Sequence, residues 1–138
     1  MTPRIDKVLE TSLYVADLAR SVRFYEAVLG LTPMFDDGRL AALDTGSGQV
    51  LLLFRRGASE APSPVPGGII PPHGGDGHLH LAFAIAADSL DAWRAQLARH
   101  RVTIEGTVLP ERGGTSVYFR DPDGHLIELA TPGLWPTY

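Results

Sequence analysis

The chain has 138 residues, 44% of them hydrophobic, and its 16 acidic against 12 basic side chains give a net charge of −4. This composition suits one compact domain, and because lysine and arginine form no stripe, it argues against a nucleic-acid backbone or a membrane surface as partner. No apolar run nears the roughly 20 residues of a membrane span and no signal-peptide segment is evident, so we expect a cytoplasmic protein. Without cysteine, any bound metal must accept nitrogen and oxygen ligands.

The first half of the chain reads as a strand, a helix and three strands. In residues 8–18 the β-prone Leu9, Leu13 and Val15 alternate with Glu10, which predicts a strand with a carboxylate on one face. Residues 17–30 place apolar side chains at helical spacing between an aspartate N-cap and a closing glycine. Three strands separated by turn sequences are expected near residues 34–37, 39–46 and 49–54.

From residue 78 the same pattern restarts. HLHLAFAIA alternates like a strand, and Leu90, Trp93 and Leu97 then share one face of a helix. Three further strands are expected near residues 103–109, 115–120 and 125–130. In this alignment Glu10 of the first copy falls on His80 of the second. A repeat of this length indicates two similar halves.

The domain organisation follows from this repeat. We expect a single domain over residues 1–138, made of one βαβββ module at 4–56 and a second at 78–133. Residues 57–77 between them are rich in proline and glycine, which disfavour regular structure and mark a linker. Ile69 and Ile70 indicate that the linker packs against something, as a lid or as an arm, although a disordered tether is also open.

Strand parity groups polar side chains on the face that the helices leave free. Leu9, Thr11, Leu13 and Val15 should face the first helix, so that Glu10, Ser12 and Tyr14 face the other way. In the second copy the opposite face carries His78, His80, Ala82 and Ala84. Glu128 lies in the last strand, and its counterpart in the first copy is Leu52. These positions should converge if the two halves meet as open troughs.

Two stretches resemble a known family. SLYVADLARSVRFYEAVLGL, residues 12–31, and YFRDPDGHLIEL, residues 118–129, are similar to the module signatures of the vicinal oxygen chelate superfamily, the glyoxalase, bleomycin-resistance and extradiol-dioxygenase group. The resemblance implies an α+β fold whose paired βαβββ modules form an eight-stranded open-barrel cleft around a divalent metal, usually in a homodimer. It also implies that Glu10, His80 and Glu128 are the metal ligands.

Two departures from the family pattern bear on the chemistry. Many members have histidine where Glu10 stands, and a two-histidine, one-carboxylate triad would be needed for a dioxygenase. Glyoxalases carry a fourth ligand where this chain has Leu52, which here leaves a position open for substrate.

The resemblance implies a glyoxalase-like enzyme. Two carboxylates and one imidazole suit Mn, Fe, Co, Ni or Zn, and such a metal stabilises an enolate or oxyanion of a small oxygen-chelating substrate in lyase or isomerase chemistry. Glu10 or Glu128 is expected to carry the proton. The remaining predicted pocket residues are Ser12, Tyr14, Leu52, His78, Ala82 and Tyr118.

Alternatives remain at this point. The cleft could sequester a drug-like molecule without metal, as bleomycin-binding members do, or a dioxygenase-like reaction could apply. Thiol transfer to fosfomycin is a third option, although no arginine and lysine cluster suits a phosphonate. Glu10 could instead be a solvated edge residue, and Glu128 could pair with an arginine. His73 and His100 are expected at the surface, and His125 is expected to be exposed in the DPDG turn.

Overall fold

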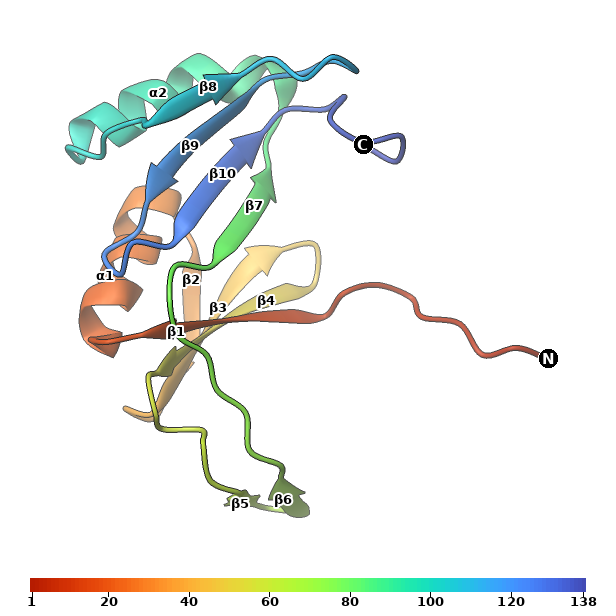
Figure 1. Cartoon of the computed structure of the whole chain (residues 1–138), viewed down its shortest axis with the longest axis vertical. Helices are drawn as coiled ribbons and strands as arrows, with labels where there is room; N and C mark the ends of the chain where they lie inside the picture. Colours follow the sequence, from red (N-terminus) through yellow and green to blue (C-terminus); the bar gives the residue numbers. More distant parts are fainter. The chain divides into compact units, whose positions relative to one another are not determined.

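Two four-stranded sheets with the same connectivity form the framework of the structure, a computed structural model of residues 1–138 (Figure 1). The first sheet has the order β1 (Glu10–Val15), β4 (Gln49–Arg55), β3 (Leu40–Gly46), β2 (Thr32–Asp36). The second has the order β7 (His80–Ala84), β10 (Leu126–Ala130), β9 (Ser116–Arg120), β8 (Gly106–Val108). β1 pairs with β4 and β7 with β10 in parallel, and the other neighbours are antiparallel. The predicted α+β class and the two βαβββ modules are confirmed.

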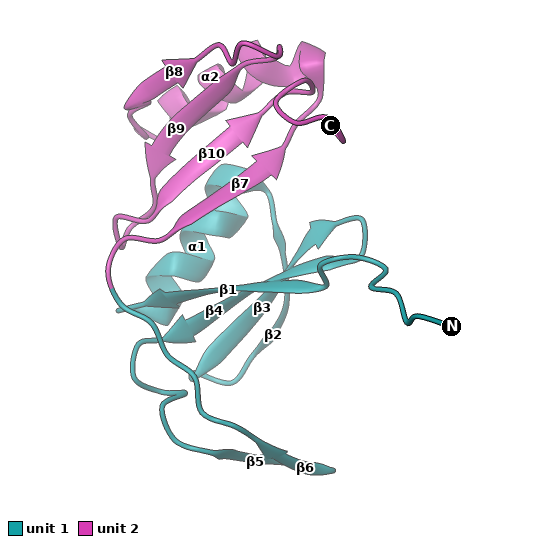
Figure 2. Cartoon of the chain, turned by 45° about the vertical axis from the view of Figure 1, so that its right-hand side comes forward, with its two compact units in different colours: residues 1–76 teal, residues 77–138 magenta.

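The chain divides into two compact units, residues 1–76 and residues 77–138 (Figure 2). Each unit holds one sheet and one longer helix: α1 (Leu18–Leu29) in the first and α2 (Leu90–Arg99) in the second. A short 3-10 turn, η1 (Ala87–Ser89), precedes α2. Neither α1 nor α2 has the length and apolar character that crossing a membrane requires.

The core of the first unit lies between α1 and one face of its sheet. Asp17 caps α1 by accepting a hydrogen bond from the backbone N–H of Arg20, and Gly30 ends the helix at a φ of 70°. Leu13 and Val15 of β1 are buried, as the parity argument predicts. Leu9 differs, because it precedes β1 and is 60% exposed. The opposite face of β1 is therefore free to line a site.

The segment expected to lack regular structure forms a short hairpin in the first unit. β5 (Ser63–Val65) pairs antiparallel with β6 (Gly68–Ile70). Pro66 and Gly67 make the turn, and Gly67 has a φ of 94°, which suits a proline–glycine turn. Ile69 and Ile70 are exposed rather than buried, so the prediction that they pack into a core is not met.

The second unit repeats the arrangement with a smaller helix. Leu97 of α2 is fully buried, and so are Val117 and Phe119 of β9 and Ile127 of β10. The C-terminal Tyr138 closes the end of the sheet, because its hydroxyl donates to the carbonyl oxygens of Ala130 and Ile85 at 2.7 and 3.1 Å. The sheet is thus fixed at the strands that carry the predicted ligands.

Candidate functional site

A histidine and a carboxylate of the second unit face each other across neighbouring strands. His80 begins β7 and Glu128 lies in the middle of β10, opposite Ala82, so both side chains share one face of the sheet. Nε2 of His80 lies 3.2 Å from Oε1 of Glu128. The Glu128 side chain is 5% exposed and that of His80 is 50% exposed. The pair therefore has one buried and one solvent-accessible member.

The backbone fixes which nitrogen of His80 carries the proton. Nδ1 lies 2.8 Å from the carbonyl oxygen of Leu126, and because a carbonyl only accepts, Nδ1 must donate. In the neutral imidazole Nε2 then presents a lone pair, and that lone pair faces the Glu128 carboxylate. Two acceptors at this distance repel unless a proton or a metal cation lies between them. An N–H donated to a carbonyl is also how metal-binding histidines are commonly oriented.

Two residues of β9 hold this pair in place. The Ser116 hydroxyl donates to Oε2 of Glu128 at 2.6 Å, which leaves Oε1 directed at His80. Tyr118 lies opposite Glu128 in the register, and its ring stacks near the His80 imidazole with centroids 6.2 Å apart. Burial raises the pKa of the Tyr118 phenol, and the charge of Glu128 raises it further. The phenol therefore stays neutral beside the carboxylate.

This donor pair suits a divalent cation. Two ligand atoms about 2.0–2.2 Å from a metal, at right or tetrahedral angles, lie about 3.0–3.5 Å apart. The distance of 3.2 Å between Nε2 and Oε1 falls in that range. Glu10 belongs to the first unit, and neither unit by itself gathers three histidine, aspartate or glutamate side chains. The structure brings together His80 and Glu128, and Glu10 stays a prediction from the sequence.

The first unit carries a cavity of about 580 Å³ on the sheet face away from α1. Three strand residues predicted for the pocket, Ser12, Tyr14 and Leu52, line it together with Glu10. Ser12 pairs with Leu52 just as Ala82 pairs with Glu128, so the register agrees with the predicted equivalence of Leu52 and Glu128. The volume matches that of typical small-molecule sites.

Other predicted pocket residues belong to the second unit. Ala82 and His78 are exposed there, and the imidazole of His78 lies against Gly124, where an added Cβ would come within 2.9 Å of Nε2. Tyr118 lies beside His80, as described above.

Sequence reasoning missed His73 of the linker, which lines this cavity instead of standing free at the surface. Its Nδ1 lies 2.8 Å from the Tyr14 hydroxyl, and its ring packs edge-on against Phe54 with centroids 4.6 Å apart. Two hydrogen bonds fix its backbone to Ser59, a residue that is 2% exposed. The backbone N–H of His73 donates to the Ser59 carbonyl at 2.9 Å, and the Ser59 hydroxyl donates to the His73 carbonyl at 2.7 Å. The glycines that follow His73 are the signal that could have indicated close packing.

Arg39 also lines the cavity and was not predicted. Its guanidinium carbon lies 5.8 Å from the centroid of the Phe54 ring, and Nη1 makes a long contact of 3.5 Å with the Ser63 hydroxyl. No carboxylate forms an ion pair with it. Nearby Asp37 accepts from the backbone N–H groups of Leu40 and Arg39, both at 2.9 Å, and the bond from Leu40 contributes most to a lowered pKa of that carboxyl.

The expectation that His125 is exposed was wrong. It is fully buried, because Nδ1 accepts a hydrogen bond of 2.9 Å from the backbone N–H of Leu79. Its own backbone N–H donates to Asp121, a buried carboxylate, also at 2.9 Å. His125 thus ties the DPDG turn to the start of β7, one residue before His80.

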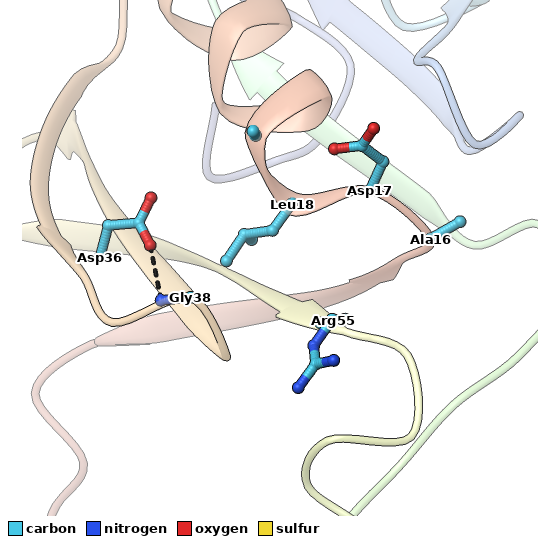
Figure 3. A pocket seen from close by; sticks show the side chains of 7 residues that line it. Ala16, Asp17, Leu18, Asp36, Gly38 and Arg55 are labelled. Carbon is cyan, nitrogen blue, oxygen red and sulfur yellow. Dashed lines mark hydrogen bonds between the residues drawn. The ribbon is translucent and has the colours of Figure 1, made fainter.

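A second hollow, of about 400 Å³, lies at the start of α1 (Figure 3). Its carboxylates already serve the local backbone: Asp17 caps the helix, and Asp36 accepts from the N–H of Gly38 at 2.9 Å. Arg55 lines the same hollow, and Figure 3 draws no hydrogen bond from it to either carboxylate. We therefore take the cavity beside Tyr14, rather than this hollow, as the ligand site of the first unit.

The family model of the Glyoxalase/Bleomycin resistance protein/Dioxygenase superfamily matches residues 4–129. The chain belongs to this superfamily. The metallothiol transferase FosB of Lysinibacillus sphaericus is 32% identical over 121 residues, which cover 87% of this chain and 78% of that protein. The glutathione transferase FosA of Serratia marcescens is 33% identical over 123 residues, which cover 89% of this chain and 79% of that protein.

A solved structure extends the superfamily comparison to the fold. The crystal structure of lactoylglutathione lyase from Agrobacterium tumefaciens matches with a TM-score of 0.87 and 30% identity, covering 97% of this chain and 99% of that one. The superfamily resemblance read from the two sequence signatures is confirmed.

Proposed function

We propose that this protein is a divalent-metal-dependent enzyme that acts on a small substrate with neighbouring oxygen atoms. The observation that carries the proposal is Nε2 of His80 held 3.2 Å from the Glu128 carboxylate, with Nδ1 directed at the Leu126 carbonyl. A carboxylate that is 5% exposed is costly to bury without a cation. Membership of the superfamily, and the similarity to two proteins named as transferases, support an enzyme.

His80 and Glu128 would hold the metal, and Glu10 is the third ligand that the sequence repeat predicts. When bound, a divalent cation supplies Lewis-acid polarisation of the substrate oxygens. Leu52, which cannot ligate, would leave a position for the substrate. Ser116 fixes Oε2 of Glu128, so that Oε1 is the atom at which this residue can accept or return a proton.

The reaction class that we favour is a lyase or isomerase step, in which a carboxylate moves a proton between neighbouring substrate atoms. Thiol transfer is the second candidate, because two relatives at 32% and 33% identity are named as thiol or glutathione transferases. The two candidates differ in whether a thiol is consumed. Turnover of lactoylglutathione supports the first candidate, whereas loss of free glutathione in the presence of fosfomycin supports the second.

Metal binding is the direct test. The purified protein should bind Mn²⁺, Ni²⁺ or Zn²⁺ at one ion per chain by calorimetry and elemental analysis. His80→Ala and Glu128→Gln should each weaken binding about 10-fold or more, as typical for ligand-shell changes, whereas the exposed His100→Ala should match the wild type. Unchanged metal affinity in Glu128→Gln, or a metal-free protein that only sequesters ligands, would refute the proposal.

We also propose a homodimer. β1 and β7 are edge strands of their sheets, and natural sheets rarely leave such edges unprotected. Light scattering at micromolar concentration should therefore give twice the 14.9 kDa chain mass. A monomer under these conditions would remove the dimer.

A further inference from the structure

We propose that the cavity of the first unit binds the anionic group of a small, partly aromatic molecule, with Arg39 pairing with the anion and the Tyr14–His73 pair flanking its apolar body. The cavity has about 580 Å³, enough for a ligand of this kind. Its interpretation as the substrate site rests on the proposed function. The binding itself does not.

Arg39 is the cation of this cavity. It is half-buried, forms no ion pair, and is held by the Phe54 ring and a long contact to Ser63. Stacking on an aromatic ring leaves the edge of a guanidinium free to donate, and the planar fork matches a carboxylate or phosphonate. Asp37 interacts with Arg39 electrostatically but forms no ion pair with it, so the guanidinium can still pair with an anion from outside the chain.

The wall next to Arg39 is aromatic and rigid. Tyr14 stacks on Phe54 with centroids 5.9 Å apart, and His73 closes the group through its contacts with both rings. Two hydrogen bonds to Ser59 fix the His73 backbone, so the linker supplies a positioned side chain. The hydroxyl–imidazole hydrogen bond can reverse its direction, which lets the pair donate to a ligand oxygen or accept from a ligand hydroxyl.

The cavity is polarised along the sheet. Tyr14 pairs with Phe54, next to Arg39, whereas Glu10 lies four residues back along β1, roughly 13 Å away at the usual rise of a strand. Ser12 and Leu52 lie between them. A ligand with an anion at one end should therefore place that end at Arg39, because Glu10 repels it at the other. Its apolar middle would lie over Leu52 and Phe54.

Cinnamate and its neutral isostere cinnamamide are suitable probes. Both are titrated by NMR into the full chain in EDTA, while the imidazole signals of His73 are followed. We expect cinnamate to bind at least 10-fold more tightly than cinnamamide, as one charge-assisted pairing is typically worth about this much. Arg39→Gln should abolish that preference, and Arg39→Lys should retain part of it. The matched control Arg23→Gln, an exposed arginine of α1 outside the cavity, should retain all of it.

Several results would overturn the inference: equal affinities of the two probes, no binding of either, or an unchanged preference in Arg39→Gln. If Arg39→Gln does not fold, the inference is judged on the wild-type protein alone. It then requires that cinnamate bind more tightly than cinnamamide and that cinnamate shift the imidazole signals of His73. The metal proposal is separable, because these titrations contain no metal. Loss of the cinnamate preference in Arg39→Gln supports the inference even where no metal binds, and an enzyme that binds metal but treats both probes alike refutes the inference alone.

Discussion

His125 offers a sharp test of how the second unit holds its ligand strand. The side chain is fully buried, and its Nδ1 accepts the backbone N–H of Leu79, the residue before His80. His125→Ala removes that acceptor and leaves a cavity. A buried unpaired N–H costs about 1–3 kcal/mol, and a large-to-small change in a core costs about 2–4 kcal/mol. Together these two terms predict a loss of about 3–7 kcal/mol in the free energy of unfolding.

A matched variant separates the cost of the unpaired N–H from the cost of the cavity. His125→Asn keeps an acceptor oxygen near the place of Nδ1, so it should recover about 1–2 kcal/mol relative to His125→Ala. Urea unfolding is followed by tryptophan fluorescence, since both tryptophans of the chain, Trp93 and Trp135, lie in the second unit. His100→Ala, at an exposed position, should stay within about 0.5 kcal/mol of the wild type. A loss below 1 kcal/mol in His125→Ala, or an asparagine variant no more stable than the alanine one, would refute the reasoning.

Three further substitutions test local features. A Cβ on Gly75 would overlap the Tyr14 ring, so Gly75→Ala should cost about 1–3 kcal/mol of stability in urea unfolding and weaken cinnamate binding; an unchanged protein would contradict the packing. The lowered pKa of Asp37, caused first by a backbone N–H of its turn, gives stability that is complete above its ordinary value of 3.8 and is lost as pH falls through the folded value. Asp37→Asn should flatten that acid limb in urea midpoints measured from pH 2 to 5, and an identical limb would refute this assignment. The raised pKa of Tyr118 gives stability that is complete below 10.0 and is lost as pH rises through the folded value. Glu128→Gln should lower that pKa partway in phenolate absorbance titrations referenced to Tyr118→Phe, because burial, the larger cause, remains; no change would exclude the carboxylate.

Local rules predicted the parts of the fold that local physics determines. The alternation of Leu13 and Val15 with polar neighbours gave the buried face of β1, because strand side chains have a period of two. Asp17 and Gly30 gave the bounds of α1 through their capping chemistry. The prediction that Leu9 faces the helix was wrong, because alternation along a strand does not indicate at which residue the strand begins.

The repeat carried long-range information that local rules lack. Aligning the two halves predicted that Leu52 and Glu128 are equivalent, and the strand register agrees. The same alignment matched Glu10 with His80, and the resemblance to the superfamily grouped His80 with Glu128 as expected metal ligands. Internal homology substitutes here for knowledge of the tertiary fold.

Residues whose environment is set by tertiary packing could not be predicted. A histidine after DPDG is exposed by default, and the hydrogen bond that His125 accepts from the N–H of Leu79 joins residues that are far apart in the sequence. His73 lies in a segment that reads as a linker, and its partner Tyr14 is far away in sequence. The hairpin at Pro66 and Gly67 had a turn signal, but the flanking strands are too short for periodicity to indicate them.

The two hydrogen bonds between Ser59 and His73 make the tip of the segment between them tolerant of insertion. Its two ends are joined by hydrogen bonds of 2.9 and 2.7 Å, so the chain returns to the same point whatever lies between. Each doubling of a flexible loop adds only about 0.6 kcal/mol of closure entropy. The hairpin tip at Gly67 can therefore accept inserted sequence while His73 keeps its position on the cavity wall. The turn at Pro66 and Gly67 is the natural place to graft a new recognition loop or reporter, because Ser63 and Ile70 on either side of it line the cavity.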